Sequence, residues 1–348
     1  MNRNLFRTFF SLLPVLPFLV SGAYDAQAGY KGYPRGNALI TVQELKGLID
    51  ARDPSLVIVA AQSNLEYLPG HIPGAQKVDR PAYAAPPETQ SGVEGNIIDA
   101  AEFTRLAQSL GIDRGSTVVI YEDRYDATRL WWAFTYYGKS DVRILDGGIQ
   151  AWKAAGFPVE ILPPAAGTKT GNFVAAVAHT GLRVDTSDIS ALHDHPTAQL
   201  WDNRSLKEFT GEEQRKGAYR AGRIPGSLHS EWVLFKKKEN RAEWVTADEM
   251  KPLLRKLGFD RKKDQYFYCQ SGVRSTQGLF ALYLSGWPLE KLHNYDSSWI
   301  GWSKEDRLPM EAGLPREDTP TLQTVREKEK TREREDQGSG SSSYGRHL

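Results

Sequence analysis

Two kinds of apolar pattern alternate along this chain. Short runs of consecutive apolar and β-branched residues, such as 56–60 and 117–121, predict buried strands. Between them lie stretches with apolar residues at helical spacing, and residues 41–50 are the first of these. Strands that alternate with helices at this spacing predict an α/β fold with a mostly parallel sheet covered on both faces.

The second half of the chain repeats this order. Residues 185–193 predict an amphipathic helix, residues 199–202 a strand, and the aromatic run 265–268 a second strand. Residues 275–284 follow as a helix, whose apolar side we expect to consist of Leu279, Phe280, Tyr283 and Leu284.

Two short motifs recur at an offset of about 150 residues, which indicates an internal repeat. Gly70-His71-Ile72-Pro73-Gly74-Ala75 returns as Gly222-Arg223-Ile224-Pro225-Gly226-Ser227. Leu145-Asp146-Gly147-Gly148-Ile149-Gln150-Ala151-Trp152 returns as Tyr295-Asp296-Ser297-Ser298-Trp299-Ile300-Gly301-Trp302. The length also favours two domains.

Proline, glycine and charge runs suggest where the domains end. Pro163-Pro164-Ala165-Ala166-Gly167 is typical of a linker, and the charged run after Arg316 followed by Gly-Ser repeats is typical of a disordered tail. The expected organisation is a signal peptide at 1–28, an N-terminal domain at 36–160, a linker at 161–180, a C-terminal domain at 181–315 and a tail at 316–348.

The first residues have the composition of a secretory signal peptide. A basic start precedes the apolar run 9–20, which two prolines interrupt and which is short for a transmembrane helix, and Ala26-Gln27-Ala28 supplies a cleavage site. We expect cleavage after Ala28, a periplasmic or secreted mature protein, and no stable membrane insertion after cleavage. An uncleaved N-terminal anchor is the alternative.

Overall charge argues against some partners. The chain carries 44 Lys and Arg against 43 Asp and Glu, a net charge of +1, so neither nucleic acid nor an anionic membrane surface is expected as the main partner. His193-Asp194-His195 has too few ligands for a metal site, and no metal or other cofactor is expected.

Cys269 is the only cysteine in the chain. It lies on a tight turn between the predicted strand 265–268 and the predicted helix 275–284, where backbone N–H groups and the positive end of a helix dipole converge. Such surroundings lower the pKa of a thiol and favour a thiolate at neutral pH. A buried structural thiol is the alternative.

With these motifs in order, the chain resembles the tandem-domain rhodanese family of sulfurtransferases over about residues 36–313. The Gly-His-Ile-Pro-Gly-Ala turn, the Asp-Gly-Gly and Asp-Ser-Ser-Trp segments, and a six-residue loop that starts at Cys269 carry the resemblance. It implies two rhodanese-like domains, each a small, mostly parallel sheet flanked by helices. The N-terminal one is expected to be non-catalytic, since Glu122 stands near the position of the cysteine.

The resemblance also implies roles for the residues of the loop. Cys269 would take a sulfane sulfur from thiosulfate as a persulfide and pass it to cyanide or a thiol. The backbone of Gln270, Ser271, Gly272 and Val273 would donate hydrogen bonds to the sulfur, and Arg274 would bind the oxygens of the donor unless it forms a surface salt bridge. Trp299 would line the cleft or simply belong to the core.

Four further residues each have a structural interpretation beside a functional one. Asp202 and Arg204 are either pocket residues or an ion pair that braces a turn, and the second role is the more common one. Arg223 and His71 occupy equivalent positions in the two repeats, where a turn-bracing role is expected.

Three alternative functions follow from the same loop. A loop similar to Cys-Gly-Ser-Gly-Val-Thr would indicate a mercaptopyruvate sulfurtransferase, but here Arg274 ends the loop and favours thiosulfate. A cysteine-dependent phosphatase needs arginine at the sixth position after the cysteine, where this chain has Ser275. The third alternative is an exported persulfide carrier that relays sulfur to a dedicated partner.

Overall fold

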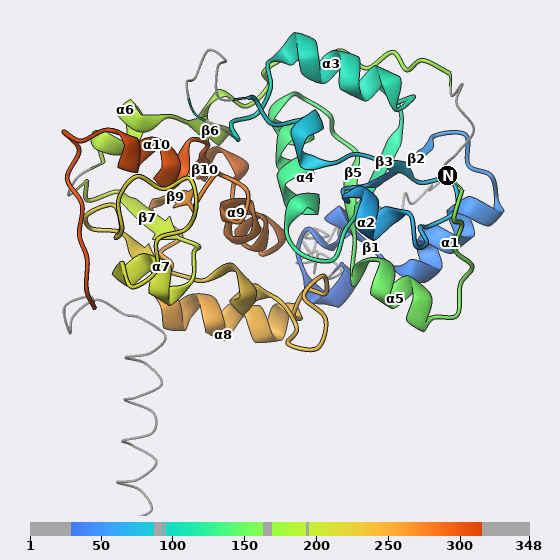
Figure 1. Cartoon of the computed structure of the whole chain (residues 1–348). Helices are drawn as coiled ribbons and strands as arrows, with labels where there is room; N and C mark the ends of the chain where they lie inside the picture. The colour runs from blue at the N-terminus through green and yellow to red at the C-terminus, as the bar shows by residue number, and fades with distance from the viewer. Residues whose placement is uncertain (1–28, 87–92, 94, 163–168, 193–194, 315–348) are drawn as a thin grey trace, which may run out of the picture.

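A computed structural model describes residues 29–86, 93, 95–162, 169–192 and 195–314, and it shows two α/β lobes side by side (Figure 1). The expected signal peptide, the Pro-Pro-Ala-Ala-Gly linker segment and the expected tail after residue 315 lie outside the described residues. Within the described part of the chain, no helix has the length and apolarity needed to cross a bilayer.

The first lobe is built on a five-stranded parallel sheet with the order β1-β5-β4-β2-β3. Its strands are β1 (Leu39–Ile40), β2 (Leu56–Ala60), β3 (Gln76–Lys77), β4 (Thr117–Tyr121) and β5 (Val142–Leu145). Its α-helices are α1 (Val42–Asp50), α2 (Asn64–Tyr67), α3 (Ala100–Ser109), α4 (Asp126–Tyr136) and α5 (Gly148–Ala154).

The second lobe repeats this topology with the order β6-β10-β9-β7-β8, again all parallel. Its strands are β6 (Arg183–Val184), β7 (Ala198–Asp202), β8 (Leu228–His229), β9 (Asp264–Tyr268) and β10 (Leu292–Tyr295). Its α-helices are α6 (Thr186–Ser190), α7 (Leu206–Thr210), α8 (Ala247–Leu257), α9 (Ser275–Leu284) and α10 (Ser298–Lys304). The expected α/β fold with two repeated parallel sheets is confirmed.

Short 3-10 helices connect several of these elements. They are η1 (Tyr30–Gly32), η2 (Gly36–Ala38), η3 (Arg80–Ala82), η4 (Thr180–Leu182), η5 (Trp232–Phe235) and η6 (Leu289–Lys291).

One apolar core runs through both lobes. Helices α4 and α9 pack against each other at the centre of the molecule (Figure 1), and the rings of Trp131 on α4 and Phe280 on α9 lie 4.7 Å apart, edge to face. Two smaller cores cover the outer faces of the sheets, one containing Leu45 and Trp152 and the other Tyr295 and Trp302. The lobes are therefore joined by buried apolar surface rather than by a linker alone.

Helix α9 differs from its expected amphipathic character. Nine of its ten residues are buried, and they include the polar side chains of Ser275, Thr276 and Gln277. The reason is tertiary, because one face of α9 packs on its own sheet and another on α4 of the other lobe. A helix that is covered on both faces has no solvent-exposed side, so its sequence lacks the amphipathic pattern of a surface helix.

Helix α6 is shorter than the expected 185–193. Asp185 caps it by accepting hydrogen bonds from the N–H groups of Ser187 and Asp188, and the helix ends at Ser190. His193 and Asp194 lie outside the described residues.

The two lobes also exchange buried polar contacts in a symmetric way. The carboxylate of Asp296, before α10, accepts the N–H of Ile97 at 3.0 Å and a guanidinium hydrogen bond from Arg129 at 2.5 Å. The equivalent carboxylate of Asp146, before α5, accepts the N–H of Trp244 at 2.8 Å. Each aspartate thus satisfies a backbone group of the opposite lobe, and this fixes how the lobes meet.

Candidate functional site

The loop from Cys269 to Arg274 connects β9 to α9, as the sequence predicts. Its shape depends on the hydroxyl of Ser298, which accepts the N–H groups of Cys269 at 3.0 Å and of Gly272 at 2.9 Å. The same hydroxyl donates to the carbonyl of Tyr295 at 2.8 Å. Ser298 is buried and has a left-handed backbone with φ of 49°, so this contact is maintained at a conformational cost.

Gly272 is required where the loop turns back. Its φ is +71°, and a Cβ atom there would lie 2.4 Å from the carbonyl oxygen of Asp296. Its own carbonyl accepts hydrogen bonds from Arg129 of the other lobe and from Asn294, both at 3.1 Å. Only glycine fits a backbone that approaches its neighbours this closely.

The sulfur of Cys269 lies inside the protein, since the residue is 1% exposed. Burial raises the pKa of the thiol, but the charge of Arg274, the N–H and hydroxyl groups of Ser275 and the N–H of Ser271 lower it, and the net pKa lies below its usual value. The Ser275 hydroxyl has no oxygen or nitrogen partner among the described residues. The site therefore stabilises the anionic form of this sulfur relative to an ordinary thiol, although the sulfur is buried.

The amide donors are not the full ring expected from the sequence. The N–H of Gly272 is directed to Ser298 instead of the sulfur, and the donors that lower the Cys269 pKa come from Ser271 and from Ser275 at the start of α9. Val273 is buried, and the side chain of Gln270 donates to the carbonyl of Lys216 at 3.3 Å.

Arg274 is not a surface residue and its guanidinium is not free. Nη1 and Nη2 donate to the two carboxylate oxygens of Glu208 at 2.7 and 2.8 Å, and both side chains are less than a tenth exposed. Although burial opposes ionisation, the contact with Arg274 lowers the pKa of Glu208 to about 2. A salt bridge, the alternative to donor binding, is thus present, but it is buried rather than on the surface, and Arg274 lowers the pKa of Cys269 while it is paired.

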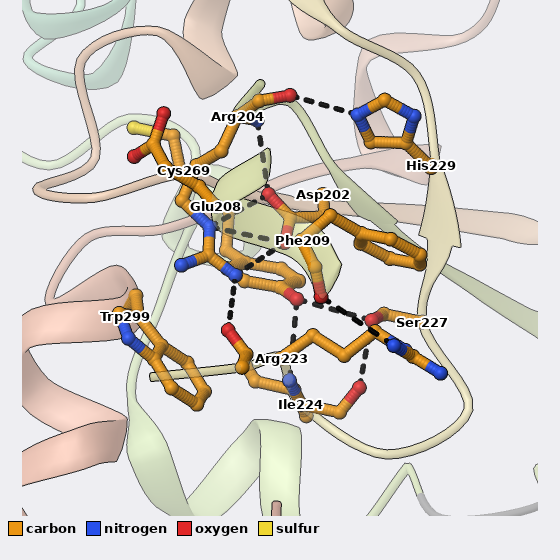
Figure 2. Close-up of polar contacts among 12 residues, drawn as sticks. Asp202, Arg204, Glu208, Phe209, Arg223, Ile224, Ser227, His229, Cys269 and Trp299 are labelled. Atoms are coloured by element: carbon orange, nitrogen blue, oxygen red, sulfur yellow. Dashed lines mark hydrogen bonds and ion pairs between the residues drawn. The ribbon is translucent and has the colours of Figure 1, made fainter. Parts of the chain in front are cut away.

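Asp202 and Arg204 form a buried ion pair (Figure 2). Arg204 donates from Nε and Nη2 to Asp202, the latter at 2.6 Å, and Nη2 also donates to the carbonyl of Gly222 at 2.8 Å. These contacts fit an ion pair that braces a turn, because they connect the end of β7 to the glycine-proline turn that begins at Gly222. The guanidinium also lies 4.8 Å from the ring centroid of Trp299.

Trp299 belongs to the packed interior. It is 1% exposed, its backbone N–H donates to the carbonyl of Cys269 at 3.0 Å, and its Nε1 donates to the carbonyl of Arg220 at 2.9 Å. Trp299 therefore belongs to the core and holds the backbone of Cys269 in place.

The residues at the glycine-proline turns make bracing contacts. Arg223 donates to the carbonyl of Gly313 at 2.8 Å and pairs with Glu311 at 3.2 Å, while His71 stacks on Tyr67 with 3.8 Å between ring centroids. The Nδ1 of His195 lies 3.0 Å from the Thr197 hydroxyl, and no group of three or more potential metal ligands exists among the described residues.

Sequence reasoning missed Ser298, although the repeat contains a signal for it. Gly148 occupies the equivalent position in the first lobe with φ of +58°. A left-handed backbone favours glycine, so a serine at this position indicates that its hydroxyl makes a contact that offsets the strain. Glu208 could not be identified from the sequence either, because the residue that it pairs with, Arg274, lies 66 positions away.

The first lobe holds Glu122 directly after β4, where the second lobe holds Cys269 directly after β9. Burial raises the pKa of Glu122, and burial also lowers the pKa of Lys236, which reaches this place from the second lobe, to about 7. Cys269 is the only cysteine of the chain, so this position holds no thiol, and the non-catalytic role of the first lobe stays a prediction.

Comparison with known proteins gives a consistent result. A family model described as "Rhodanese-like domain" matches residues 41–155 and again 185–305. The chain is 31% identical to "Sulfur carrier protein TtuD" of Thermus thermophilus, over 81% of this chain and 99% of that protein. It is 32% identical to "Putative thiosulfate sulfurtransferase SseA" of Mycobacterium bovis (83% and 95%) and 31% identical to "Probable 3-mercaptopyruvate sulfurtransferase" of Pseudomonas aeruginosa (79% and 98%).

Solved structures include a similar protein with a modified cysteine. A structure of EanB with ergothioneine linked to a cysteine persulfide superposes with a TM-score of 0.71 and 26% identity. The match covers 81% of this chain and 71% of that one.

The close contact at Gly272 can be tested against a matched glycine. Gly226 has φ of +72°, like Gly272, but a Cβ there would meet nothing within 4 Å. Gly226→Ala should cost about 1–2 kcal/mol of unfolding free energy from backbone strain alone. Gly272→Ala should cost at least about 2 kcal/mol more and abolish sulfur transfer, as measured by urea unfolding and a thiocyanate assay. Equal losses in the two variants would contradict the contact with Asp296.

The non-catalytic role of the first lobe can be tested at Glu122. Glu122→Gln keeps the volume and removes only a carboxylate whose pKa burial already raises. We expect sulfur transfer within about twofold of the unmodified protein. A tenfold loss, with unchanged thermal stability, would mean that the first lobe takes part in the chemistry.

Proposed function

Because the chain belongs to the rhodanese-like family, we propose that it is a sulfurtransferase in which the thiolate of Cys269 carries a single sulfur atom between two small molecules. The observation that supports this most directly is the lowered pKa of a lone cysteine at a strand-to-helix turn. Relatives named as thiosulfate and 3-mercaptopyruvate sulfurtransferases support the same reaction class.

In the first half-reaction, the thiolate attacks the terminal sulfane sulfur of a donor such as thiosulfate. A bond forms between Sγ and that sulfur, the S–S bond of thiosulfate breaks, and its electron pair leaves with sulfite. One thiolate and one dianion thus become one persulfide anion and one sulfite dianion. The N–H groups of Ser271 and Ser275 and the charge of Arg274, which lower the thiol pKa, would also stabilise the persulfide.

In the second half-reaction, cyanide or a thiolate attacks the outer sulfur of the persulfide. The new bond forms to the acceptor, the S–S bond to Cys269 breaks, and the electron pair returns to Sγ. The product is thiocyanate or a new persulfide, and no redox cofactor is needed because the enzyme thiolate is regenerated. The cycle is ping-pong catalysis through a covalent intermediate.

Thiosulfate is the donor that we propose, with mercaptopyruvate as the alternative. A buried sulfur suits a donor whose transferable atom is terminal, a condition that thiosulfate and mercaptopyruvate both meet. The loop ends in Arg274 rather than in threonine, which distinguishes it from the mercaptopyruvate-type loop. Relatives of nearly equal identity have names of both types.

A persulfide carrier is the second candidate function. The relative from Thermus thermophilus is named a sulfur carrier protein and is matched over nearly its full length. The same thiolate would serve such a relay, with slow release to cyanide and fast release to one protein partner.

We further propose that the protein works outside the cytoplasm. The basic start, the proline-interrupted apolar run at 9–20 and Ala26-Gln27-Ala28 support an N-terminal signal peptide. A lone cysteine in an oxidising compartment is consistent with a reactive thiol rather than a disulfide partner.

The reaction is tested by intact-mass spectrometry after incubation with thiosulfate. We expect the protein to gain the mass of one sulfur atom and to lose it on addition of cyanide, with thiocyanate released. Cys269→Ala should neither gain mass nor form thiocyanate, while its far-UV circular dichroism stays unchanged. Thiocyanate formation by the alanine variant at near the original rate would disprove the mechanism.

Export is tested by isolating the protein from its native host and determining the N-terminus. Cleavage after Ala28 predicts a chain that starts at Gly29. Recovery of the uncleaved chain in the membrane fraction would favour the N-terminal anchor instead.

A further inference from the structure

Glu208 is placed where several charges of the site converge. It is the third residue after Ser205, at the start of α7, and its side chain is 1% exposed. Its carboxylate accepts two hydrogen bonds from Arg274, and the Nε of Arg215 lies 3.4 Å from Oε2. It also accepts the N–H of Ser205 at 3.2 Å.

Helix capping alone does not explain this residue. The chain has equivalent capping boxes in which a glutamate stands at the third helical position, and none of these glutamates is buried: Glu44, Glu66, Glu102 and Glu249. Glutamine serves the same capping function. Glu208 alone among these five is buried against a guanidinium that acts on a nucleophile.

The charges near the sulfur nearly cancel. Arg204 is paired with Asp202, and Arg274 is paired with Glu208. Arg129, which donates to the carbonyl of Gly272, shares the carboxylate of Asp296 with Arg183. Arg215 reaches Glu208 from the surface and also contacts Glu213. Glu231 faces Arg274 as well, with burial raising its pKa. A dianionic donor therefore meets little uncompensated positive charge.

Glu208 also remains ionised under all conditions of interest, since its pKa is lowered to about 2. Its negative charge is fixed and lies in a part of the protein with little solvent. At such a place a single charge acts more strongly on an approaching anion than a surface charge does.

We propose that Glu208 sets the charge preference of the site for sulfur donors: by neutralising Arg274 it disfavours dianionic donors relative to monoanionic ones. It is a specificity-determining residue, not a catalytic one. The inference rests on the proposed sulfurtransferase function, and it names the donor property that the site discriminates. Thiosulfate remains a substrate, but one whose affinity Glu208 limits.

Two donors with the same reactive atom make the test. Thiosulfate is a dianion and methanethiosulfonate a monoanion, and both transfer a terminal sulfur to a thiolate. With the second donor, the bond to Sγ forms while the S–S bond breaks and methanesulfinate leaves with the electron pair. The measured quantity is the ratio of kcat/KM for thiosulfate to that for methanethiosulfonate, with cyanide as the acceptor.

Glu208→Gln removes the charge and keeps the volume and the capping acceptor. We expect the donor ratio to rise by at least about fivefold, mostly through a lower KM for thiosulfate. The control is Glu213→Gln, because Glu213 contacts the same Arg215 but is 40% exposed and does not contact Arg274. Its donor ratio should change by less than about twofold.

Two further variants separate charge from fold. Arg274→Gln leaves Glu208 unpaired and should lower the ratio, and the double variant Glu208→Gln with Arg274→Gln should return it toward the original value. If Glu208→Gln alone fails to fold, the donor ratios of Arg274→Gln and of the double variant can still be compared to test whether the charge of Glu208 affects donor preference. A ratio unchanged across the folded variants would overturn the inference. Absence of a persulfide with either donor in the unmodified protein would instead overturn the proposed function.

Discussion

A buried sulfur anion has to be compensated by fixed groups, and this requirement explains the geometry of the turn between β9 and α9. Water cannot stabilise a thiolate on a residue that is 1% exposed. The groups that do so are the N–H of Ser271, the N–H and hydroxyl of Ser275, and the paired guanidinium of Arg274. They converge only if β9 ends and α9 begins within six residues, which in turn requires the left-handed turn at Gly272 and the hydroxyl of Ser298.

The same strand-to-helix turn serves different purposes in the two lobes. In both, a tyrosine at the strand end accepts a backbone N–H from the glycine-proline turn: Tyr121 from Ile72 and Tyr268 from Ile224, each at 3.2 Å. The framework is therefore shared. What differs is the next residue, which is a carboxyl group with a raised pKa in the first lobe and a thiol with a lowered pKa in the second.

Much of the fold could be predicted from sequence because its strands are continuous apolar or aromatic runs bounded by polar turns. The ends of β2, β4 and α9 match the prediction to the residue. The burial of α9 could not be predicted, since it depends on α4 of the other lobe. The sequence shows that Cys269 and Arg274 lie on one loop. It does not show that the guanidinium of Arg274 is paired with Glu208, because that pairing also depends on the tertiary fold. Pairings across long separations are set by topology, whereas a strand end or a turn is set by local residues.

The reciprocal use of Asp146 and Asp296 limits how far the protein can be shortened. Each carboxylate accepts an amide N–H of the opposite lobe, and Arg129 of the lobe without a cysteine donates to the carbonyl of Gly272 in the lobe that has one. A fragment that holds only the second lobe would contain the whole Cys269 loop and still lack these supports. The two lobes therefore form one structural unit, even though only one of them carries the sulfur.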